Sequence, residues 1–325
     1  MLRWIAGLAM GLAPLSGAAE KAAPTPWTFD VPPDGRVTLT IDGQAVTALV
    51  TPGMPSNVYV SRDWATAHFG EAANRFEERK RGFALVSIGL ATDAKVGPVR
   101  VKGAARIARV GLDGREAKAR VQWFQTDAYR FGDALAGPYA LPAPVVRFHL
   151  RARQAGETSV TLPLAPRRWW LATTPRRFGG KEVRFAFAPH FPISVASAAA
   201  GAAIASDLGG TLGGETEHVR ISHGVERPVR RMALARPLAF GATPLDALLV
   251  RTRDYGDAST IATGAEDDPS ESGDDILVTG KRKGTPPSYV VYLGADALRG
   301  CSTITYDKVA ATVTLSCVSR DAPTR

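Results

Sequence analysis

Residues 292–317 read YLGADALRGCSTITYDKVAATVTLSC and contain two runs of strand-forming residues separated by a short turn. The runs, 303–306 and 312–315, are rich in Thr, Val, Ile and Tyr, which fit the pleated surface of a sheet. A short helical signal at 295–298 precedes them. The stretch therefore predicts a turn, a single turn of helix and a β-hairpin.

Two cysteines flank this predicted hairpin. If Cys301 and Cys317 face each other across antiparallel strands, the turn centres on Val309, which fits the Asp-Lys-Val-Ala-Ala stretch between the strands. We predict a disulfide here, which the loop-entropy model values at about 3 kcal/mol of stabilisation. The alternative is a pair of reduced, buried thiols. The disulfide would require an oxidising compartment.

The N-terminus is typical of a secretory signal peptide. A basic start, residues 1–3, precedes an apolar run, 4–15, and small residues follow it as far as Ala19. This order predicts a signal peptide over residues 1–19, cut near Ala18 or Ala19. The alternative is a buried N-terminal helix. We expect an exported protein, located in the periplasm or outside the cell.

The composition bounds the remaining possibilities. The chain has 325 residues, of which 45% are hydrophobic and 22% charged, which excludes disorder along the whole length, collagen and coiled coil. The length suggests two domains of ordinary size. The formal net charge is +9, but for an exported protein we expect no nucleic-acid partner. Because no apolar run reaches the roughly 20 residues that span a bilayer, we expect no integral membrane protein.

The two halves of the chain share short matches in the same order. Residues 135–141 align with 292–298, and 159–162 align with 312–315, which indicates a duplication. Strand patterns predominate in both halves. Helical signals are few and short, at 61–69, 198–207 and 295–298.

The closing segment resembles that of retropepsin-like and pepsin-like aspartic proteases. In that family a hydrophobic-hydrophobic-Gly turn, a short helix and a strand ending in Asp precede a last strand ending in Leu. Gly294, residues 296–298, Asp307 and Leu315 fill those positions. Near the start, RVTLTIDGQAVTALV forms a strand, an Asp-Gly hairpin turn and a second strand, and runs into TPGMPSNVYVS, where the family has Asp-Thr/Ser-Gly-Ala.

The resemblance implies a mostly β, two-lobed architecture of double-psi antiparallel type with few short helices. It places an N-terminal lobe over 27–165, a connector over 166–181 and a C-terminal lobe over 182–321. Residues 262–287 of the second lobe form an insertion in which six acidic residues lie among Gly, Ser and Pro. That composition is typical of a flexible, solvated loop.

The catalytic positions of the family are degenerate in this sequence. The family uses two carboxylates, one from each lobe, that share a proton and activate water. The resemblance puts these positions on Thr51 and Ala196. Neither is acidic, and a Thr hydroxyl has no pKa near neutrality and cannot act as the base. The turns expected to wall an inter-lobe cleft are Thr51, Pro52 and Gly53 in one lobe and Ala196, Ser197 and Ala198 in the other.

Other chemistries have little support. His218 and His223 are five apart on a predicted strand and would point to opposite faces, so we expect no metal site. The Gly-rich segment 209–214 lacks the residues of a phosphate loop and predicts a flexible turn, so we expect no cofactor. Asp254 and Asp257 form the nearest acidic cluster after a strand.

Three hypotheses of function follow. The leading one is a catalytically inactive, aspartic-protease-like protein that holds an extended peptide or protein in an inter-lobe cleft. The second is an active peptidase that uses non-standard acids such as Asp254 or Asp257. The third is a structural envelope protein that docks a partner through 262–287, where residues 274–282 resemble the segment that begins the plug domain of TonB-dependent receptors.

Overall fold

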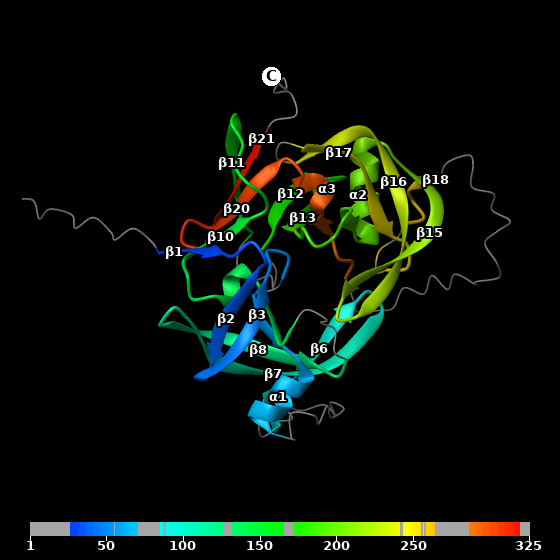
Figure 1. The fold of residues 1–325 in the computed structure, drawn as a ribbon. Coiled ribbons are helices and arrows are strands. Elements are labelled where there is room, and N and C mark those ends of the chain that lie inside the picture. Colours follow the sequence, from blue (N-terminus) through cyan, green and yellow to red (C-terminus); the bar gives the residue numbers. More distant parts are fainter. Residues whose placement is uncertain are drawn as a thin grey trace, which may run out of the picture.

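The computed structural model describes residues 27–318 except 55, 71–84, 87–88, 127–131, 166–171, 241–242, 255, 257 and 264–285. Its strands form two eight-stranded sheets and one five-stranded sheet (Figure 1). The N-terminal half builds the first eight-stranded sheet and the C-terminal half builds the second, whereas the five-stranded sheet takes strands from both halves. The expected signal peptide lies outside the described residues.

The N-terminal lobe is a sheet in the order β2-β3-β9-β4-β8-β7-β6-β5. Its strands follow the alternation of the sequence, because successive side chains of a strand point to opposite faces. In β2, for example, Val37, Leu39 and Ile41 are buried and the residues between them are not. The bounds are β2 Arg36–Ile41, β3 Gln44–Val50, β4 Val58–Val60, β5 Leu85–Val86, β6 Gly89–Val96, β7 Val99–Leu112, β8 Arg115–Phe124 and β9 Ala134–Ala136.

The C-terminal lobe is a sheet in the order β12-β13-β19-β14-β17-β16-β15-β18. The Gly-rich segment 209–214, expected to be a flexible turn, instead ends a helix at Gly209 and opens β15. A Cβ on Gly210 would lie 2.7 Å from the Cβ of Ala205, so glycine is what lets the strand pass the helix. The bounds are β12 Thr174–Phe178, β13 Lys181–Phe187, β14 Val195–Ala196, β15 Gly210–Ser222, β16 Val225–Phe240, β17 Thr243–Arg251, β18 Ala262–Thr263 and β19 Val290–Leu293.

The strand order of the second lobe repeats that of the first over seven positions, and differs at the eighth, where β5 pairs with β6 antiparallel and β18 pairs with β15 parallel. The parallel pair β3–β9 corresponds to β13–β19, and the antiparallel pair β4–β9 corresponds to β14–β19. The parallel pair β4–β8 likewise corresponds to β14–β17. The chain therefore has the mostly β, two-lobed architecture that the sequence predicted.

A five-stranded sheet joins the lobes in the order β1-β10-β20-β21-β11. Strands β10 and β11, which end the first half, lie on either side of the β20–β21 hairpin that ends the second half, and none of the four joins a lobe sheet. The range expected as a connector, 166–181, also contains β12. The bounds are β1 Thr28–Val31, β10 Val145–His149, β11 Glu157–Pro163, β20 Cys301–Asp307 and β21 Thr312–Val318.

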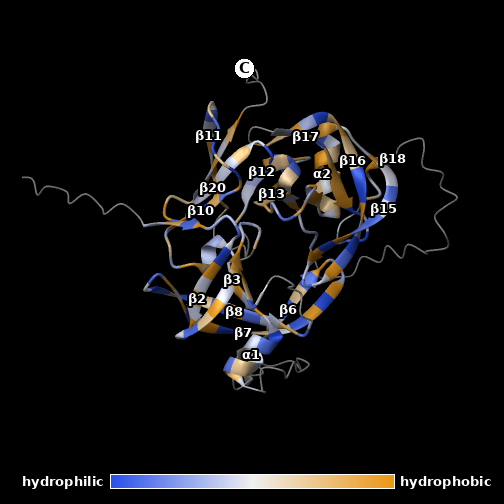
Figure 2. Cartoon of the chain, viewed as in Figure 1, coloured by the Kyte–Doolittle hydropathy of each residue, from blue (hydrophilic) through white to orange (hydrophobic). Residues whose placement is uncertain are grey.

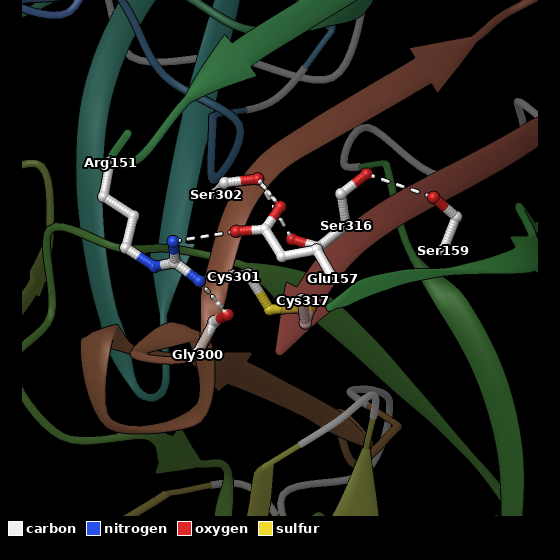
Figure 3. Close-up of a disulfide and its surroundings, with 8 residues drawn as sticks. All are labelled: Arg151, Glu157, Ser159, Gly300, Cys301, Ser302, Ser316 and Cys317. Atoms are coloured by element: carbon white, nitrogen blue, oxygen red, sulfur yellow. Dashed lines mark hydrogen bonds and ion pairs between the residues drawn. A yellow bond between two sulfur atoms is a disulfide. The ribbon is translucent and has the colours of Figure 1, made fainter. Parts of the chain in front are cut away.

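The predicted disulfide lies in this joining sheet and is confirmed (Figure 3). Cys301 and Cys317 are opposite each other in the β20–β21 pair, with the turn between Asp307 and Thr312. Beside them the buried Glu157 carboxylate accepts hydrogen bonds from Ser302 Oγ at 2.5 Å, and it pairs with Arg151 Nη1 at 2.8 Å (Figure 3). These contacts tie β11 of the first half to β20 of the second.

The helices occur where the sequence predicted them. They are α1 Arg62–Phe69, α2 Ala198–Leu208 and α3 Ala295–Leu298, with a 3-10 turn η2 at Pro138–Ala140. Ser61 caps α1 and Ser197 caps α2, each by accepting a bond from a backbone N–H in the first turn of its helix. Hydrophobic and hydrophilic residues alternate along many of the strands (Figure 2). No helix among the described residues has the length and apolar character that crossing a membrane requires.

Candidate functional site

The first site turn follows β3 and consists of Thr51, Pro52 and Gly53. The Thr51 N–H donates to the Ala136 carbonyl on β9 at 3.0 Å. The N–H of Met54 donates back to the Thr51 carbonyl at 3.4 Å, which closes the turn. These two bonds fix where the Thr51 side chain lies.

The second site turn follows β13 and consists of Ala188, Pro189 and His190. The Ala188 N–H donates to the Leu293 carbonyl on β19 at 2.8 Å, and the Phe191 N–H donates to the Ala188 carbonyl at 3.0 Å. Both bonds repeat those of the first turn, since β13 and β19 correspond to β3 and β9. Ala188 is therefore the structural counterpart of Thr51.

The two turns meet at Gly53. A Cβ placed on Gly53 would lie 2.8 Å from the Ala188 Cβ and 3.0 Å from the His190 Cε1. Real Cβ atoms do not approach so closely, so a side chain at this position would push the lobes apart. Glycine in the first turn is what allows the lobes to touch here.

The second turn is thus not the one expected from the sequence. Ala196 ends β14, is fully buried and pairs with Val250 and Val291, while Ser197 caps α2 and Ala198 begins that helix. The family resemblance had placed the second turn on residues that form the two-residue strand β14 and the start of α2. A usable signal was present, because a proline follows the strand in both lobes, in Val-Thr-Pro-Gly at 50–53 and Phe-Ala-Pro-His at 187–190.

Neither turn contains a carboxyl group. Thr51 offers a hydroxyl, Ala188 offers only a methyl, and His190 carries an imidazole whose ring lies 4.4 Å from that of Phe191. Among the described residues no group of three or more His, Cys, Asp and Glu side chains is placed to hold a metal.

Two hairpin tips reach across from lobe to lobe beside these turns. The β6–β7 tip belongs to the N-terminal lobe, yet its Val96 is buried in an apolar cluster with Ala188 and Phe191. The β15–β16 tip belongs to the C-terminal lobe, yet its Val225 packs on a cluster that contains Tyr59. The chain's own valines therefore fill space next to both turns.

The β15–β16 tip also inserts an aromatic ring into the opposite lobe. The His223 ring lies 4.3 Å from that of Phe124 and 5.5 Å from that of Tyr59, measured between ring centroids. Burial disfavours the charged imidazole and lowers the pKa of His223 to about 4. At neutral pH this tip is docked in its uncharged form.

A charged cluster lies beneath the β6–β7 tip. Arg251 Nη2 lies 2.7 Å from Asp254 Oδ2, and both side chains are almost fully buried. Arg227 is 7% exposed, and its Nε and Nη2 have no hydrogen-bond partner among the described residues. Burial is the main cause that lowers the pKa of Arg227 from its usual value. A small cavity of about 180 Å³ lies beside the cluster, between Gly97 and Tyr292.

A larger groove lies on the other side of the hairpin tips. Its volume is about 520 Å³, and it runs between residues 99–102 of β7, Gln125 and Thr126 beyond β8, and the β15–β16 tip at 223–225. We call it the inter-lobe groove, because each lobe supplies one wall. Unlike the site turns, it has open space for a ligand.

Comparisons with known proteins add little to this geometry. No family model and no curated protein matches the sequence. Among solved structures, a similar one is the EIAV protease complexed with the inhibitor HBY-793, at 17% sequence identity and a TM-score of 0.19. The match covers 31% of this chain and 79% of that chain. The fold assignment therefore depends on the strand order and pairing described above.

Proposed function

We propose that this chain is an exported protein of aspartic-protease type that has no peptidase activity and binds an extended peptide or protein segment between its lobes. The observation that carries the proposal is the pair of site turns. Thr51 and Ala188 occupy equivalent positions in the two lobes, their turns are in contact, and neither position has a carboxyl group.

The chemistry of the aspartic-protease mechanism requires both carboxyls. One must be ionised to activate water, while the other must be protonated to polarise the scissile carbonyl. A Thr hydroxyl stays protonated at any pH at which proteins fold, and a methyl has no proton to exchange. With Thr51 and Ala188 in these positions, both functions are missing.

The competing hypothesis is a peptidase that uses Asp254. Its carboxylate is 2.7 Å from the guanidinium of Arg251 and its side chain is 2% exposed, an arrangement that suits a structural ion pair better than a base that binds water. Asp257, the second acid of that hypothesis, lies outside the described residues, as do residues 264–285 of the insertion proposed to dock an envelope partner.

Two observations support export. The sequence of residues 1–19 has the order of a signal peptide, and the Cys301–Cys317 disulfide is of the kind that persists in oxidising compartments. A fusion of residues 1–30 to a reporter that folds only outside the cytoplasm should be exported and cut near Ala19. Retention of the uncut fusion inside the cell would contradict this part of the proposal.

A single experiment tests binding and cleavage together. The purified protein is incubated with a random peptide library at acidic and neutral pH, and mass spectrometry analyses the bound and free fractions. We expect a subset of peptides to be retained with their ends intact, with Thr51→Ala behaving as the wild type. Pepstatin-sensitive cleavage that is lost in Asp254→Asn would refute the proposal and favour the peptidase.

A further inference from the structure

The last strand of the joining sheet, β11, pairs on one side only. It is antiparallel to β21 over residues 157–163 and lies at the margin of the sheet (Figure 1). On its outer side the chain returns at Thr173, whose carbonyl accepts from the Ala165 N–H at 2.7 Å, beyond the end of the strand. The residues that follow Thr173 form β12, which is described throughout and pairs with β13. Among the described residues, no strand therefore lies along the outer edge of 157–161.

One hydrogen bond fixes which backbone groups of β11 point outward. The Leu164 N–H donates to the Ala311 carbonyl, on the β21 side, at 2.9 Å. Because consecutive residues of a strand turn their backbone groups to opposite sides, every second residue back from Leu164 also bonds to β21. The N–H and C=O groups of Ser159 and Thr161 therefore point away from β21, toward the open edge.

The side chains of β11 leave this edge accessible. Exposed edge strands are usually protected by charges, proline, a bulge or a covering element, but residues 158–162 read Thr-Ser-Val-Thr-Leu and carry no charge. Residues 158–161 are all exposed, although they alternate between the two faces of the sheet. Val160 is 37% exposed and lies opposite Leu315, which is buried in the core. The apolar layer of the core thus reaches the edge at Val160.

This segment is complementary to itself. In an antiparallel pair of two copies centred on Val160, that valine lies opposite its own equivalent. Ser159 of each copy then lies opposite Thr161 of the other, and each such pair exchanges two backbone hydrogen bonds. On one face the two valines continue the apolar layer. On the other face the hydroxyls extend the ladder in which Ser159 bonds to Ser316 at 3.2 Å (Figure 3) and Thr161 bonds to Thr314 at 2.9 Å.

We propose that a second copy of this chain binds along β11, so that two joining sheets form one continuous sheet in a symmetric dimer. The same patch serves on both copies, as a two-fold interface requires, and it contains no like charges that would meet across the axis. This inference goes beyond peptide binding, because β11 does not line the inter-lobe groove.

The first test is the molar mass of the purified protein, measured by light scattering over a range of concentrations. We expect twice the mass of one chain. Val160→Lys should give the mass of one chain, because two ammonium groups would face each other across the pair. The matched control is Val309→Lys, the same change in the turn between β20 and β21, where the valine is 75% exposed; this variant should remain dimeric.

A backbone variant separates strand pairing from side-chain packing. Ser159→Pro removes an N–H that points outward and leaves every hydrogen bond to β21, a place where an edge strand tolerates proline. It should also be monomeric, and circular dichroism verifies that each variant is folded. A wild type that is monomeric at every concentration, or a Val160→Lys variant that stays dimeric, would overturn the inference.

Cross-linking tests the register. The two cysteines of the chain are bonded to each other, so a cysteine introduced by substitution is the only free thiol. In Val160→Cys the two new thiols would lie on directly opposite residues about 4.5 Å apart at Cα, which suits a disulfide. We expect a covalent dimer on a non-reducing gel for Val160→Cys and none for Val309→Cys, although Val309 is the more exposed. Equal cross-linking of the two variants would show random collision and contradict the pairing.

Discussion

Gly97 lies at the tip of the β6–β7 hairpin with a φ of 58°, against side chains of the opposite lobe. A Cβ at this position would lie 2.6 Å from Asp254 Oδ1 and 3.3 Å from Arg227 Nε. Gly53 has the same role at the site turns. Contact between the lobes therefore depends on two positions where the absence of a side chain allows close approach.

Replacing Gly97 by Ala should destabilise the protein more than the same change at a free turn. Gly114 is the matched control, because it also has a positive φ, 73°, and a Cβ there would meet nothing within 4 Å. Backbone strain should reduce the free energy of unfolding by about 1 kcal/mol in each variant, and the clash at Gly97 should at least double that. Urea unfolding measures the free energy of unfolding of each variant. Equal losses of stability in the two variants would show that the hairpin tip is not in close contact with Asp254.

Single residues also show where the sequence was and was not informative. The turn at Thr51 was predictable because a strand, an Asp-Gly turn and a second strand lead directly into it. Ala188 could not, because its methyl has no chemical signature and the strand after its turn has only two residues. The true equivalence appeared only through the paired backbone hydrogen bonds of the two turns.

At the scale of elements, the β15–β16 tip is the most acid-sensitive part of the site. Desolvation lowers the pKa of His223 to about 4, whereas in the unfolded chain the imidazole keeps its usual value near 6.5. Above that usual value the residue is neutral in both states and favours neither. As the pH falls through this window, the unfolded chain binds a proton that the docked tip excludes, and stability is lost.

We predict that this loss amounts to about 3 kcal/mol between neutral pH and pH 4. His223→Asn should reduce the slope of unfolding free energy against pH over that window, since Asn tolerates the positive φ of 52° at this position but does not titrate. His218→Asn, on the same hairpin, is the control. An unchanged slope in the His223 variant would mean that the ring is not desolvated.

The β20–β21 hairpin shows how far pattern reasoning can reach. Its strands, turn and disulfide were all predictable, because Thr, Val, Ile and Tyr runs and two cysteines at matching distances from the turn agree on one register. This hairpin pairs with β10 and β11 of the first half. That pairing was not predictable, because the sequence of a strand does not specify which distant strand it will pair with.

Removing the disulfide should destabilise the protein by about 3 kcal/mol. The bond closes a loop of 16 residues and so lowers the conformational entropy of the unfolded chain. Cys301→Ala with Cys317→Ala tests this, because both residues are buried and Ala leaves no unpaired thiol. The midpoint of urea unfolding should fall, and dithiothreitol should affect the wild type but not the variant. An unchanged midpoint would show that the β11–β21 and β10–β20 pairings suffice without the bond.

At the scale of the whole molecule, two lobes of similar strand order bring two turns into contact, and neither turn contains a carboxyl group. The duplication was visible as two short sequence matches, and the strand order extends it over the first seven positions of each lobe sheet, from β2 to β6 and from β12 to β15. The sequence could not indicate that each hairpin tip packs against the opposite lobe. Each tip contributes one valine, Val96 or Val225, and a single apolar side chain has no pattern from which its partner could be inferred.

The contact between the two turns can be measured directly in solution. In a protein with labelled alanine methyl groups, the nuclear Overhauser effect from the Ala188 methyl to the α-protons of Gly53 reports their separation. We predict a strong effect for Ala188 and none for the Ala196 methyl, which is buried on β14. A strong effect from Ala196 and none from Ala188 would contradict the equivalence of Thr51 and Ala188, and with it the proposal that these two turns occupy the positions of a catalytic pair.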